Sequence, residues 1–523
     1  MYRRFLATAA VLALGAGAAS AEFKLTILHT NDFHDRYEPI SKYDGPCAPE
    51  DNTAGDCFGG SARLVTALAE ARARAENSIL VDGGDQFQGT LFYTYYKGKM
   101  TAEFMTKLGY DAMTVGNHEF DDGPEVLAGF IDAVGFPVLM SNADVSMEPA
   151  LKDKIAKSTV IEKGGEKIGL IGLTPLDTPE IASPGKNVIF TDPAQAVQGE
   201  VDKLTAEGVT KIIVLSHSGY VVDKKVAAET TGVDVIVGGH DNTYLSNVSE
   251  DAVGPYPTMV GDTAIVQAYA YGKFLGELNV VFDDAGKITS ASGEPLIMDK
   301  AVAEDSDTLA RIAELAKPLD EIRNKVVADT SAEIDGNRDV CRQVECTMGN
   351  LVADAQLARV KDQGVTISLA NSGGLRASID AGEVTMGEVL TVLPFQNTLA
   401  TFETTGQTLI DALENGVSQY EEKAGRFLQV AGMKYTFDIS QPAGSRVSDV
   451  LVAEGDQWVP IDPAKTYLVV TNNYVRNGGD GFKMFVDAPK AYDFGPDLAD
   501  VVAEFLAASG SYAPYTDGRI TKK

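Results

Sequence analysis

The sequence of 523 residues has few cysteines, histidines and tryptophans and is short of positive charge. It contains four Cys, five His and one Trp, and its 44 basic residues against 75 acidic ones give a formal charge of −31. Such an acidic chain repels nucleic-acid polymers and anionic membranes, so we expect neither as a partner. A small anionic substrate is compatible with this charge if local cations overcome the repulsion.

Long apolar runs are also absent, except at the N-terminus. There, two arginines precede an apolar stretch over residues 5–18, and the small-residue sequence A-S-A ends at Ala21. The stretch is short for a bilayer span, which needs about 20 residues, so we favour a signal peptide over 1–21 rather than a membrane anchor. We therefore expect an exported protein without an anchor, periplasmic or secreted after cleavage near Ala21.

The four cysteines form two pairs that are close in sequence, Cys47 with Cys57 and Cys341 with Cys346. In an exported protein we expect each pair to be a disulfide. The alternative is a single zinc site with four cysteine ligands, whose two halves would come from opposite ends of the chain. Disulfides that close such short loops would stabilise local structure more than the whole fold.

Short apolar runs alternate with helical stretches over residues 22–304, which predicts an α/β domain. Residues 305–335 follow as a linker that begins with an amphipathic helix, in which Pro318 predicts a kink or break. A second domain, α/β or α+β, is expected over 336–523.

Side chains that can bind metals follow five of the predicted strands, at the point where each strand ends. The strands are predicted over 24–29, 78–81, 112–115, 211–216 and 233–237. The side chains that follow them are Asp32, His34, Asp85, Asn117, His118, His217, His240 and Asn242. Open α/β sheets place their ligand sites beyond the carboxyl ends of the strands. We therefore expect these residues to converge on one site.

Four of the five histidines lie in these loops, whereas isolated histidines are more often core or surface residues. The fifth, His29, ends a predicted strand, and we interpret it as a residue that orders the adjacent loop. Imidazole and carboxylate ligands suit two divalent cations such as Zn, Mn, Co or Mg. A carboxylate that bridges two cations is typical of two-metal hydrolases, and we expect Asp85 to have this role.

The motifs resemble those of a known family. D-x-H at 32–34, G-D-x-x-x-G at 84–89, G-N-H-E-F-D at 116–121, H-S at 217–218 and G-G-H-x-N at 238–242 are similar to the motifs of calcineurin-like metallophosphoesterases. More closely, they resemble the 5′-nucleotidase/UDP-sugar hydrolase family, over essentially the whole mature chain. The resemblance implies an N-terminal layered α/β/β/α metallophosphoesterase domain and a C-terminal α/β nucleotide-binding domain.

The resemblance also implies a role for each loop residue. It implies one metal held by Asp32, His34, Asp85 and Asn242 and a second held by Asp85, Asn117, His217 and His240. It further implies a catalytic dyad of His118 and Asp121, which are three residues apart and could face each other on one helical turn. The alternative for Asp121 is a solvated charge within the acidic run 119–122.

The second half of the chain matches the same family. C-R-Q-V-E-C at 341–346, N-S-G-G-L-R at 371–376 and N-G-G-D-G-F at 477–482 resemble its substrate-binding motifs. The implied substrate contacts are Arg342, Asn371, Arg376, Phe395, Tyr474 and Asp480. Arg342 and Arg376 would hold phosphate oxygens, the two aromatic residues would stack the base, and Asp480 would bind the ribose. Without the resemblance, both aromatic residues would be interpreted as core.

The expected function is hydrolysis of nucleoside 5′-phosphates in an interdomain cleft, by in-line attack of a water that two metals activate. UDP-sugars and nucleoside di- or triphosphates are further expected substrates. Within the same class, a 2′,3′-cyclic-nucleotide 2′-phosphodiesterase/3′-nucleotidase is an alternative with similar motifs. A periplasmic solute-binding protein is the alternative from another class, but it would not need the converging His and Asp residues.

Overall fold

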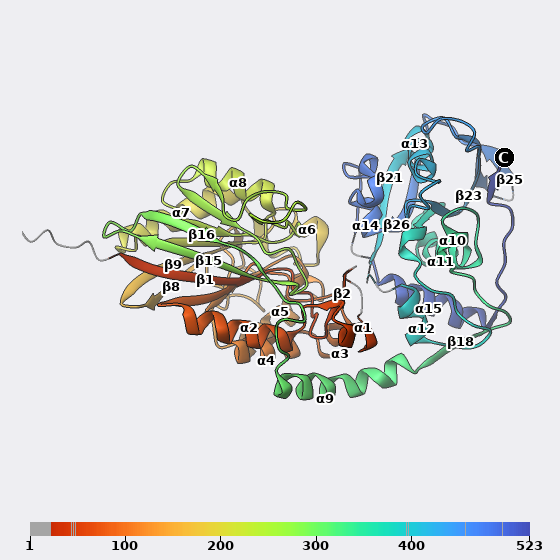
Figure 1. Ribbon diagram of the computed structural model, residues 1–523. Coiled ribbons are helices and arrows are strands. Elements are labelled where there is room, and N and C mark those ends of the chain that lie inside the picture. Colours follow the sequence, from red (N-terminus) through yellow and green to blue (C-terminus); the bar gives the residue numbers. More distant parts are fainter. Residues whose placement is uncertain are drawn as a thin grey trace, which may run out of the picture.

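The computed structural model describes residues 22–523 except 43, 45, 46, 48, 394, 396, 456 and 494. The signal peptide expected over 1–21 lies outside the described residues. The chain forms two halves, which a long helix connects along one side of the molecule (Figure 1). Within the described part of the chain, no helix has both the length and the apolar character of a membrane span.

Two sheets pack face to face in the N-terminal half. The first has the strand order β16-β15-β1-β4-β5-β6 with β17 beside β15, and the second has the order β13-β14-β12-β11-β9-β8. The first consists of β1 (Phe23–Thr30), β4 (Ser78–Asp82), β5 (Ala112–Thr114), β6 (Val138–Leu139), β15 (Phe274–Phe282), β16 (Ile288–Gly293) and β17 (Leu296–Ile297). The second consists of β8 (Ser158–Lys163), β9 (Glu166–Leu173), β11 (Ile212–Ser216), β12 (Val235–Val237), β13 (Thr258–Val260) and β14 (Thr263–Val266).

A core of alternating apolar side chains fills the space between these sheets. Ile27 of β1 and Val81 of β4 belong to the same buried cluster as Val214 of β11 and Val237 of β12. The strands that bear the loops of interest are parallel to their neighbours: β1 pairs with β4, β4 with β5, and β11 with β12. Their carboxyl ends therefore meet at one edge of the sandwich.

Helices cover both outer faces of the sandwich (Figure 1). Those on the first sheet include α2 (Ser61–Arg74), α4 (Gly98–Leu108) and α5 (Pro124–Ala133), whose apolar sides form a second core with that sheet. On the second sheet lie α7 (Pro193–Ala206) and α8 (Tyr220–Glu229), whose buried apolar side chains belong to the same cluster as those of the strands. The expected α/β/β/α layering is confirmed.

The connecting helix α9 (Ser306–Arg323) begins at Asp305, whose side chain accepts a hydrogen bond from the amide of Thr308. Of the predicted kink or break at Pro318, the break is wrong, because the helix continues through this residue to Arg323. Packing explains the difference: Leu315 and Leu319, on either side of the proline, are buried in the second core of the N-terminal half. Tertiary contacts of this kind override the local preference of proline.

The described residues of the C-terminal half form three sheets. The central one has the order β21-β26-β19-β22, and sheets of order β25-β24-β23-β28 and β20-β18-β27 flank it. The central strands are β19 (Ile367–Asn371), β21 (Leu399–Thr405), β22 (Leu428–Ala431) and β26 (Thr466–Asn472). The flanking strands are β18 (Val326–Thr330), β20 (Gly382–Thr385), β23 (Met433–Phe437), β24 (Val447–Glu454), β25 (Gln457–Pro460), β27 (Ser511–Tyr512) and β28 (Ile520–Lys522). Helices α11 (Thr347–Val360) and α15 (Leu498–Ser509) share one core of this half, and α13 (Gly406–Val417) packs into the other.

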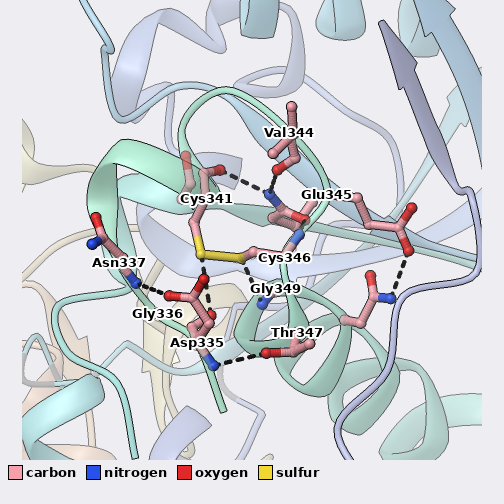
Figure 2. The surroundings of a disulfide bond; sticks show 12 residues. Asp335, Gly336, Asn337, Cys341, Val344, Glu345, Cys346, Thr347 and Gly349 are labelled. Atoms are coloured by element: carbon pink, nitrogen blue, oxygen red, sulfur yellow. Dashed lines mark hydrogen bonds between the residues drawn. A yellow bond between two sulfur atoms is a disulfide. The ribbon is translucent and has the colours of Figure 1, made fainter. Parts of the chain in front are cut away.

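Both expected disulfides are confirmed. Cys47 pairs with Cys57, and Cys341 with Cys346, at Cα separations of 6.1 and 5.1 Å. The second disulfide closes a loop at the start of α11, where Cys346 is the N-cap residue (Figure 2). The side-chain amide of Gln429 donates to the carbonyls of Cys341 (2.7 Å) and Val344 (2.8 Å). This pairing excludes the single four-cysteine zinc site.

Candidate active site

The predicted ligand side chains converge where the two sheets of the N-terminal half end. Two groups of side chains are arranged closely enough to hold an ion, with ligand atoms within 4.8 Å of one another. One group is Asp32, His34 and Asp85, and the other is Asp85, His217 and His240. Asp85 belongs to both groups, which is the geometry of a carboxylate between two cations.

Distances within the cluster are short. The Nε2 of His217 lies 2.8 Å from Oδ2 of Asp85, and the Nε2 of His34 lies 4.0 Å from the same oxygen. Asp32 is equally close, with its Oδ1 3.8 Å from His217 Nε2 and 3.9 Å from His34 Nε2. Asn117 accompanies the second group, because its Oδ1 lies 3.0 Å from Nδ1 of His240.

The donor set fits two divalent cations. The Nδ1 atoms of His217 and His34 bond to the backbone carbonyls of Gly83 (2.6 Å) and Phe87 (3.1 Å), which leaves each Nε2 available as a metal ligand. The Oδ1 of Asn242 is buried without a hydrogen-bond partner in the described part of the chain, which is costly for an amide oxygen that has no ligand. No cysteine thiol competes, since all four are in disulfides. Nitrogen and oxygen donors of this kind suit divalent first-row metals.

The charges of the cluster are mutually dependent. Burial disfavours the charged form of Asp85, but His217, His118 and His34 outweigh it and hold the pKa of this carboxyl well below its usual range. Burial also raises the pKa of Asp32 to about 7, although His217 opposes the shift. Burial lowers the pKa of His34 to about 3, so its imidazole is neutral at physiological pH. A neutral imidazole and an ionised carboxylate are the forms that bind metals.

The backbone at the ligands is strained. Five of the seven predicted metal ligands have a positive φ: Asp32 (49°), His34 (52°), Asp85 (56°), His240 (82°) and Asn242 (52°). Positive φ is uncommon for residues other than glycine, and it persists only where the surroundings enforce it. Hydrogen bonds between the loops supply that enforcement here. The amide of Asp32 donates to Gly84 O (2.9 Å), and that of His34 to Asp85 O (3.1 Å).

Glu119 is the main residue of the site that the sequence did not reveal. No role was expected for Glu119, which lies in the acidic run 119–122, yet it is fully buried. Its Oε2 accepts the amides of Asp85 (3.0 Å) and Gly116 (2.6 Å), and its Oε1 accepts those of Gln86 (2.8 Å) and Phe87 (3.1 Å). One carboxylate thus joins the Asp85 loop to the loop of Gly116. The only signal in the sequence was its place inside the G-N-H-E-F-D motif.

Gly116 shows how closely the loops approach. A Cβ atom at this position would lie 2.2 Å from Oδ1 of Asp85. Any side chain there would displace the carboxylate, so only glycine fits.

His118 and Asp121 face each other, as their spacing predicted. They lie at the two ends of a short 3₁₀ turn, with His118 Nδ1 2.7 Å from Asp121 Oδ2. The Nε2 of His118 lies 3.9 Å from Oδ2 of Asp85, so the ring borders the ligand cluster. Burial alone would lower the pKa of His118, but Asp121 and Asp85 outweigh it and raise this pKa to about 10. The solvated interpretation of Asp121 is not supported, because only 17% of its side chain is exposed.

His29 lies apart from the ligand cluster. It is fully buried, its Nε2 is 2.7 Å from the hydroxyl of Tyr256, and the two rings stack. Burial lowers its pKa to about 3. These contacts match the structural interpretation of this residue.

The predicted substrate residues of the C-terminal half form a second cluster. Asp480 is at its centre, since its Oδ2 accepts Asn371 Nδ2 (2.8 Å) and its Oδ1 accepts the hydroxyl of Tyr474 (3.1 Å). The guanidinium of Arg376 lies over the ring of Phe395, 5.2 Å from its centre. Phe395 and Tyr474 both retain exposed area, 46% of the residue for Tyr474, so their rings are accessible.

Arg342 belongs to the same cluster. It lies in the loop that Cys341–Cys346 closes, and its Nη1 donates to the carbonyl of Lys423 (3.1 Å). Its charge interacts with that of Asp480. The disulfide (Figure 2) closes the loop that carries this arginine, and the hydrogen bonds of Gln429 to the carbonyls of Cys341 and Val344 hold it.

The two clusters lie on opposite sides of the boundary between the halves. A cavity of about 340 Å³ lies at this boundary, lined by Thr90 and Asp121 from one half and by Met386 and Thr398 from the other. Among the described residues, no hydrogen bond or ion pair joins the two clusters directly. The structure therefore assembles each cluster separately and leaves space between the halves.

Comparisons with known proteins agree with this division. Residues 25–244 match the family model described as calcineurin-like phosphoesterase, and residues 326–487 match 5′-nucleotidase, C-terminal domain. The chain is 40% identical to a 5′-nucleotidase of Diplobatis ommata (96% of this chain, 90% of that protein) and 38% identical to a human 5′-nucleotidase (98% and 93%). A crystal structure of a 5′-nucleotidase precursor from Thermus thermophilus is 42% identical, with a TM-score of 0.67 over 96% of this chain and 99% of that one. The chain therefore belongs to the 5′-nucleotidase family, with a calcineurin-like phosphoesterase domain followed by a 5′-nucleotidase C-terminal domain.

Proposed function

We propose that the protein hydrolyses nucleoside 5′-monophosphates to nucleoside and inorganic phosphate. The observation that carries this proposal is Asp85, which is shared by two groups of metal-ligating side chains. The family relationship supports the nucleotide as substrate, as does the cluster of aromatic, Arg and Asp side chains in the C-terminal half.

The metal centre would use seven side chains. Asp32, His34, Asp85 and Asn242 would hold one ion, and Asp85, Asn117, His217 and His240 the other. When bound, two divalent cations supply an activated water and neutralise charge on the phosphate. This neutralisation is needed in a chain whose formal charge is −31. Glu119 would keep Asp85 in place by accepting the amide of Asp85 and that of the neighbouring Gly116.

His118 and Asp121 would act on the phosphoryl group. The imidazole of His118 borders the ligand cluster and is protonated at neutral pH, because Asp121 and Asp85 raise its pKa. A protonated imidazole can donate a hydrogen bond to a phosphoryl oxygen as negative charge develops in the transition state. Asp121 would orient the ring through its contact with Nδ1.

The C-terminal half would bind the rest of the nucleotide. Arg342 and Arg376 would hold phosphate oxygens, since a guanidinium can form paired hydrogen bonds to them. Phe395 and Tyr474 would stack the base, and the carboxylate of Asp480, with Asn371 beside it, would accept the ribose hydroxyls. We assign the chemistry to residues 22–304, nucleoside recognition to 336–523, and the connection to 305–335.

Export is part of the proposal. The two disulfides fit an oxidising compartment, such as a periplasm or the extracellular space. Removal of a signal peptide near Ala21 would deliver the chain there without an anchor. Mass spectrometry of the protein recovered outside the cytoplasm should give an N-terminus at Glu22.

A substrate panel on re-metallated protein tests the function. Protein stripped with EDTA would be loaded with Zn, Mn, Co or Mg, and phosphate release measured with AMP, 3′-AMP, 2′,3′-cyclic AMP and UDP-glucose. We expect two metals per chain and the highest kcat/KM with AMP. Faster turnover of 3′-AMP or of the cyclic nucleotide would contradict the proposal in favour of the related phosphodiesterase. A chain that binds AMP but no metal would instead be a binding protein.

A further inference from the structure

A second cavity lies between the halves, next to the connecting helix. It has a volume of about 550 Å³ and contains none of the residues assigned above to metals or nucleotide. Its walls are the segment 35–40, α3 (Leu91–Tyr96), α9 and the C-terminal α12 (Met386–Val392) with Leu393. Both halves of the chain therefore contribute to it.

Most of the wall is apolar. The apolar lining residues include Ile40, Phe92, Leu309, Ile312, Leu390 and Leu393. Two charged lining residues pair with each other, with Arg323 Nη2 3.6 Å from Glu38 Oε2, and Glu304 pairs with Arg63 at 3.3 Å. A pocket of this size, with mainly apolar walls and a set of charged groups at defined positions, can hold a small organic ligand.

Arg36 is the exception among the charged lining residues. Only 7% of the residue is exposed, and its Nε is buried without a hydrogen-bond partner. In the described part of the chain, its guanidinium has neither a hydrogen bond nor an ion pair, and lies 5.2 Å from the centre of the Tyr271 ring. A guanidinium Nε that is buried without an acceptor is unfavourable.

Two carboxylates lie near Arg36, and both accept hydrogen bonds from other donors, although Oδ2 of Asp35 has no hydrogen-bond partner among the described residues. Asp35 accepts the hydroxyls of Tyr37 (2.5 Å) and Thr101 (3.1 Å). Asp44 accepts the hydroxyl of Tyr269 (2.5 Å) and the ammonium of Lys273 (2.9 Å). Both influence Arg36 through their charge, but neither meets its N–H groups at hydrogen-bond distance. Among the described residues, none gives Arg36 an acceptor at hydrogen-bond distance, and its guanidinium borders the cavity.

The geometry points to a binding site for a small organic anion in this cavity. Arg36 would bind its carboxylate, sulfonate or phosphate group, and the aliphatic side chains of α9 and α12 would cover an apolar or aromatic body. Charge-assisted hydrogen bonds from a guanidinium to such a group are among the strongest available to a protein. Because the lining residues come from both halves, an occupant would contact both at once. The site does not depend on the proposed nucleotidase activity.

The probe for this site is 1-anilinonaphthalene-8-sulfonate, an aromatic body with one anionic group whose fluorescence rises on burial. We expect the metal-loaded protein to bind one equivalent saturably. Ala313→Phe, which fills the cavity from the exposed face of α9, should abolish this binding. The matched control is Ala310→Phe, the same change at an exposed residue of the same helix that does not line the cavity. It should bind the probe like the parent protein.

Changes at Arg36 test the anion contact. Arg36→Met should weaken binding by about tenfold or more, since it removes charge-assisted hydrogen bonds, whereas Arg36→Lys should retain part of the affinity. Metal content and melting temperature would show whether each variant is folded; if Arg36→Met is not, Arg36→Lys and the two α9 variants decide the outcome.

Phe395→Ala separates this site from the nucleoside cluster and should leave probe binding unchanged. Three results would overturn the inference: equal binding by the Ala313 and Ala310 variants, parental affinity in a folded Arg36→Met, or loss of the probe in Phe395→Ala.

Discussion

The metal-ligating cluster of the N-terminal half and the Asp480 cluster of the C-terminal half differ in burial and in backbone strain. In the N-terminal half, Asp85 and His217 are 2% and 0% exposed, and the backbone that carries the ligands is held at unfavourable angles. In the C-terminal half, Tyr474 is 46% exposed, and one carboxylate, Asp480, organises the cluster through two side-chain contacts. Chemistry at a metal centre needs fixed positions, whereas recognition of a nucleoside needs accessible surfaces.

The largest effect should come from the residue that both ligand groups share. Asp85→Asn should lower kcat/KM at least about a thousandfold, because it weakens both metal positions together. The loss should be equal for AMP and for p-nitrophenyl phosphate, and metal analysis should show fewer than two ions per chain. Asp122→Asn, a nearby exposed carboxylate paired with Lys97, is the control and should keep full activity. A variant that retained two metals and turned over both substrates would rule out the bridging role.

The second largest loss of activity should come from a change at Glu119, whose carboxylate supports the Asp85 loop. Glu119→Gln replaces an acceptor of four amides by a group that presents N–H donors to some of them. We expect metal affinity and kcat/KM to fall about 10- to 100-fold, as for other residues that orient ligands. Excess metal should restore part of the activity, which a merely misfolded protein would not show. Glu125→Gln, at an exposed position of α5, should change neither quantity.

A change in the other half should affect only one class of substrate. Phe395→Ala should raise KM for AMP about tenfold, since stacking of one base contributes roughly 1–3 kcal/mol. Hydrolysis of p-nitrophenyl phosphate, which has no base or ribose, should be unchanged. The matched control is Trp458→Ala, an exposed aromatic residue of the same half outside the cluster. If activity on both substrates fell equally, the proposed division between the halves would be wrong.

The smallest effect concerns stability and pH. Burial raises the pKa values of Asp35 and Asp82 to about 8 and that of Asp32 to about 7, and neighbouring carboxylates raise those of His118 and His217 to about 10 against the effect of burial. Groups whose pKa is raised in the folded state stabilise it at low pH and lose that contribution as the pH rises through the folded pKa. Metal-free protein should therefore melt at lower temperature at pH 8 than at pH 6.5.

Metal binding acts in the opposite direction, because it requires deprotonated ligands and strengthens as the pH rises. The difference in melting temperature between metal-loaded and EDTA-treated protein should thus widen by several degrees between pH 6.5 and 8. Differential scanning calorimetry would measure it. If the difference in melting temperature narrowed between pH 6.5 and 8, the assignment of these residues as metal ligands would be contradicted.

The sequence indicated which residues form each cluster better than it indicated the buried contacts that hold them in place. Asp32, Asp85 and His217 were found because ligand sites in such folds follow the ends of strands, a pattern that is local in sequence. Glu119 was missed because nothing local distinguishes a buried carboxylate from a solvated one. Its burial depends on loops that the fold brings to it.

The continuity of α9 through Pro318 was missed for a similar reason. The helix continues because Leu315 and Leu319 pack in a core formed by residues far away in the sequence. The spacing of residues along the helix does not reveal such contacts. The cavity at Arg36 could not be predicted either, since its walls come from segments more than 350 residues apart in the chain.

The positive φ angles of the ligands restrict the chemistry of the site over evolutionary time. Aside from glycine, the residues that most readily adopt this conformation are Asn, Asp and His. These are also the residue types found at the five strained ligand positions. A substitution by Glu or Cys would have to satisfy the metal and an unfavourable backbone together. The set of amino acids that readily fit these five positions is therefore small, and its donors are nitrogen and oxygen, so the backbone there disfavours thiolate ligands.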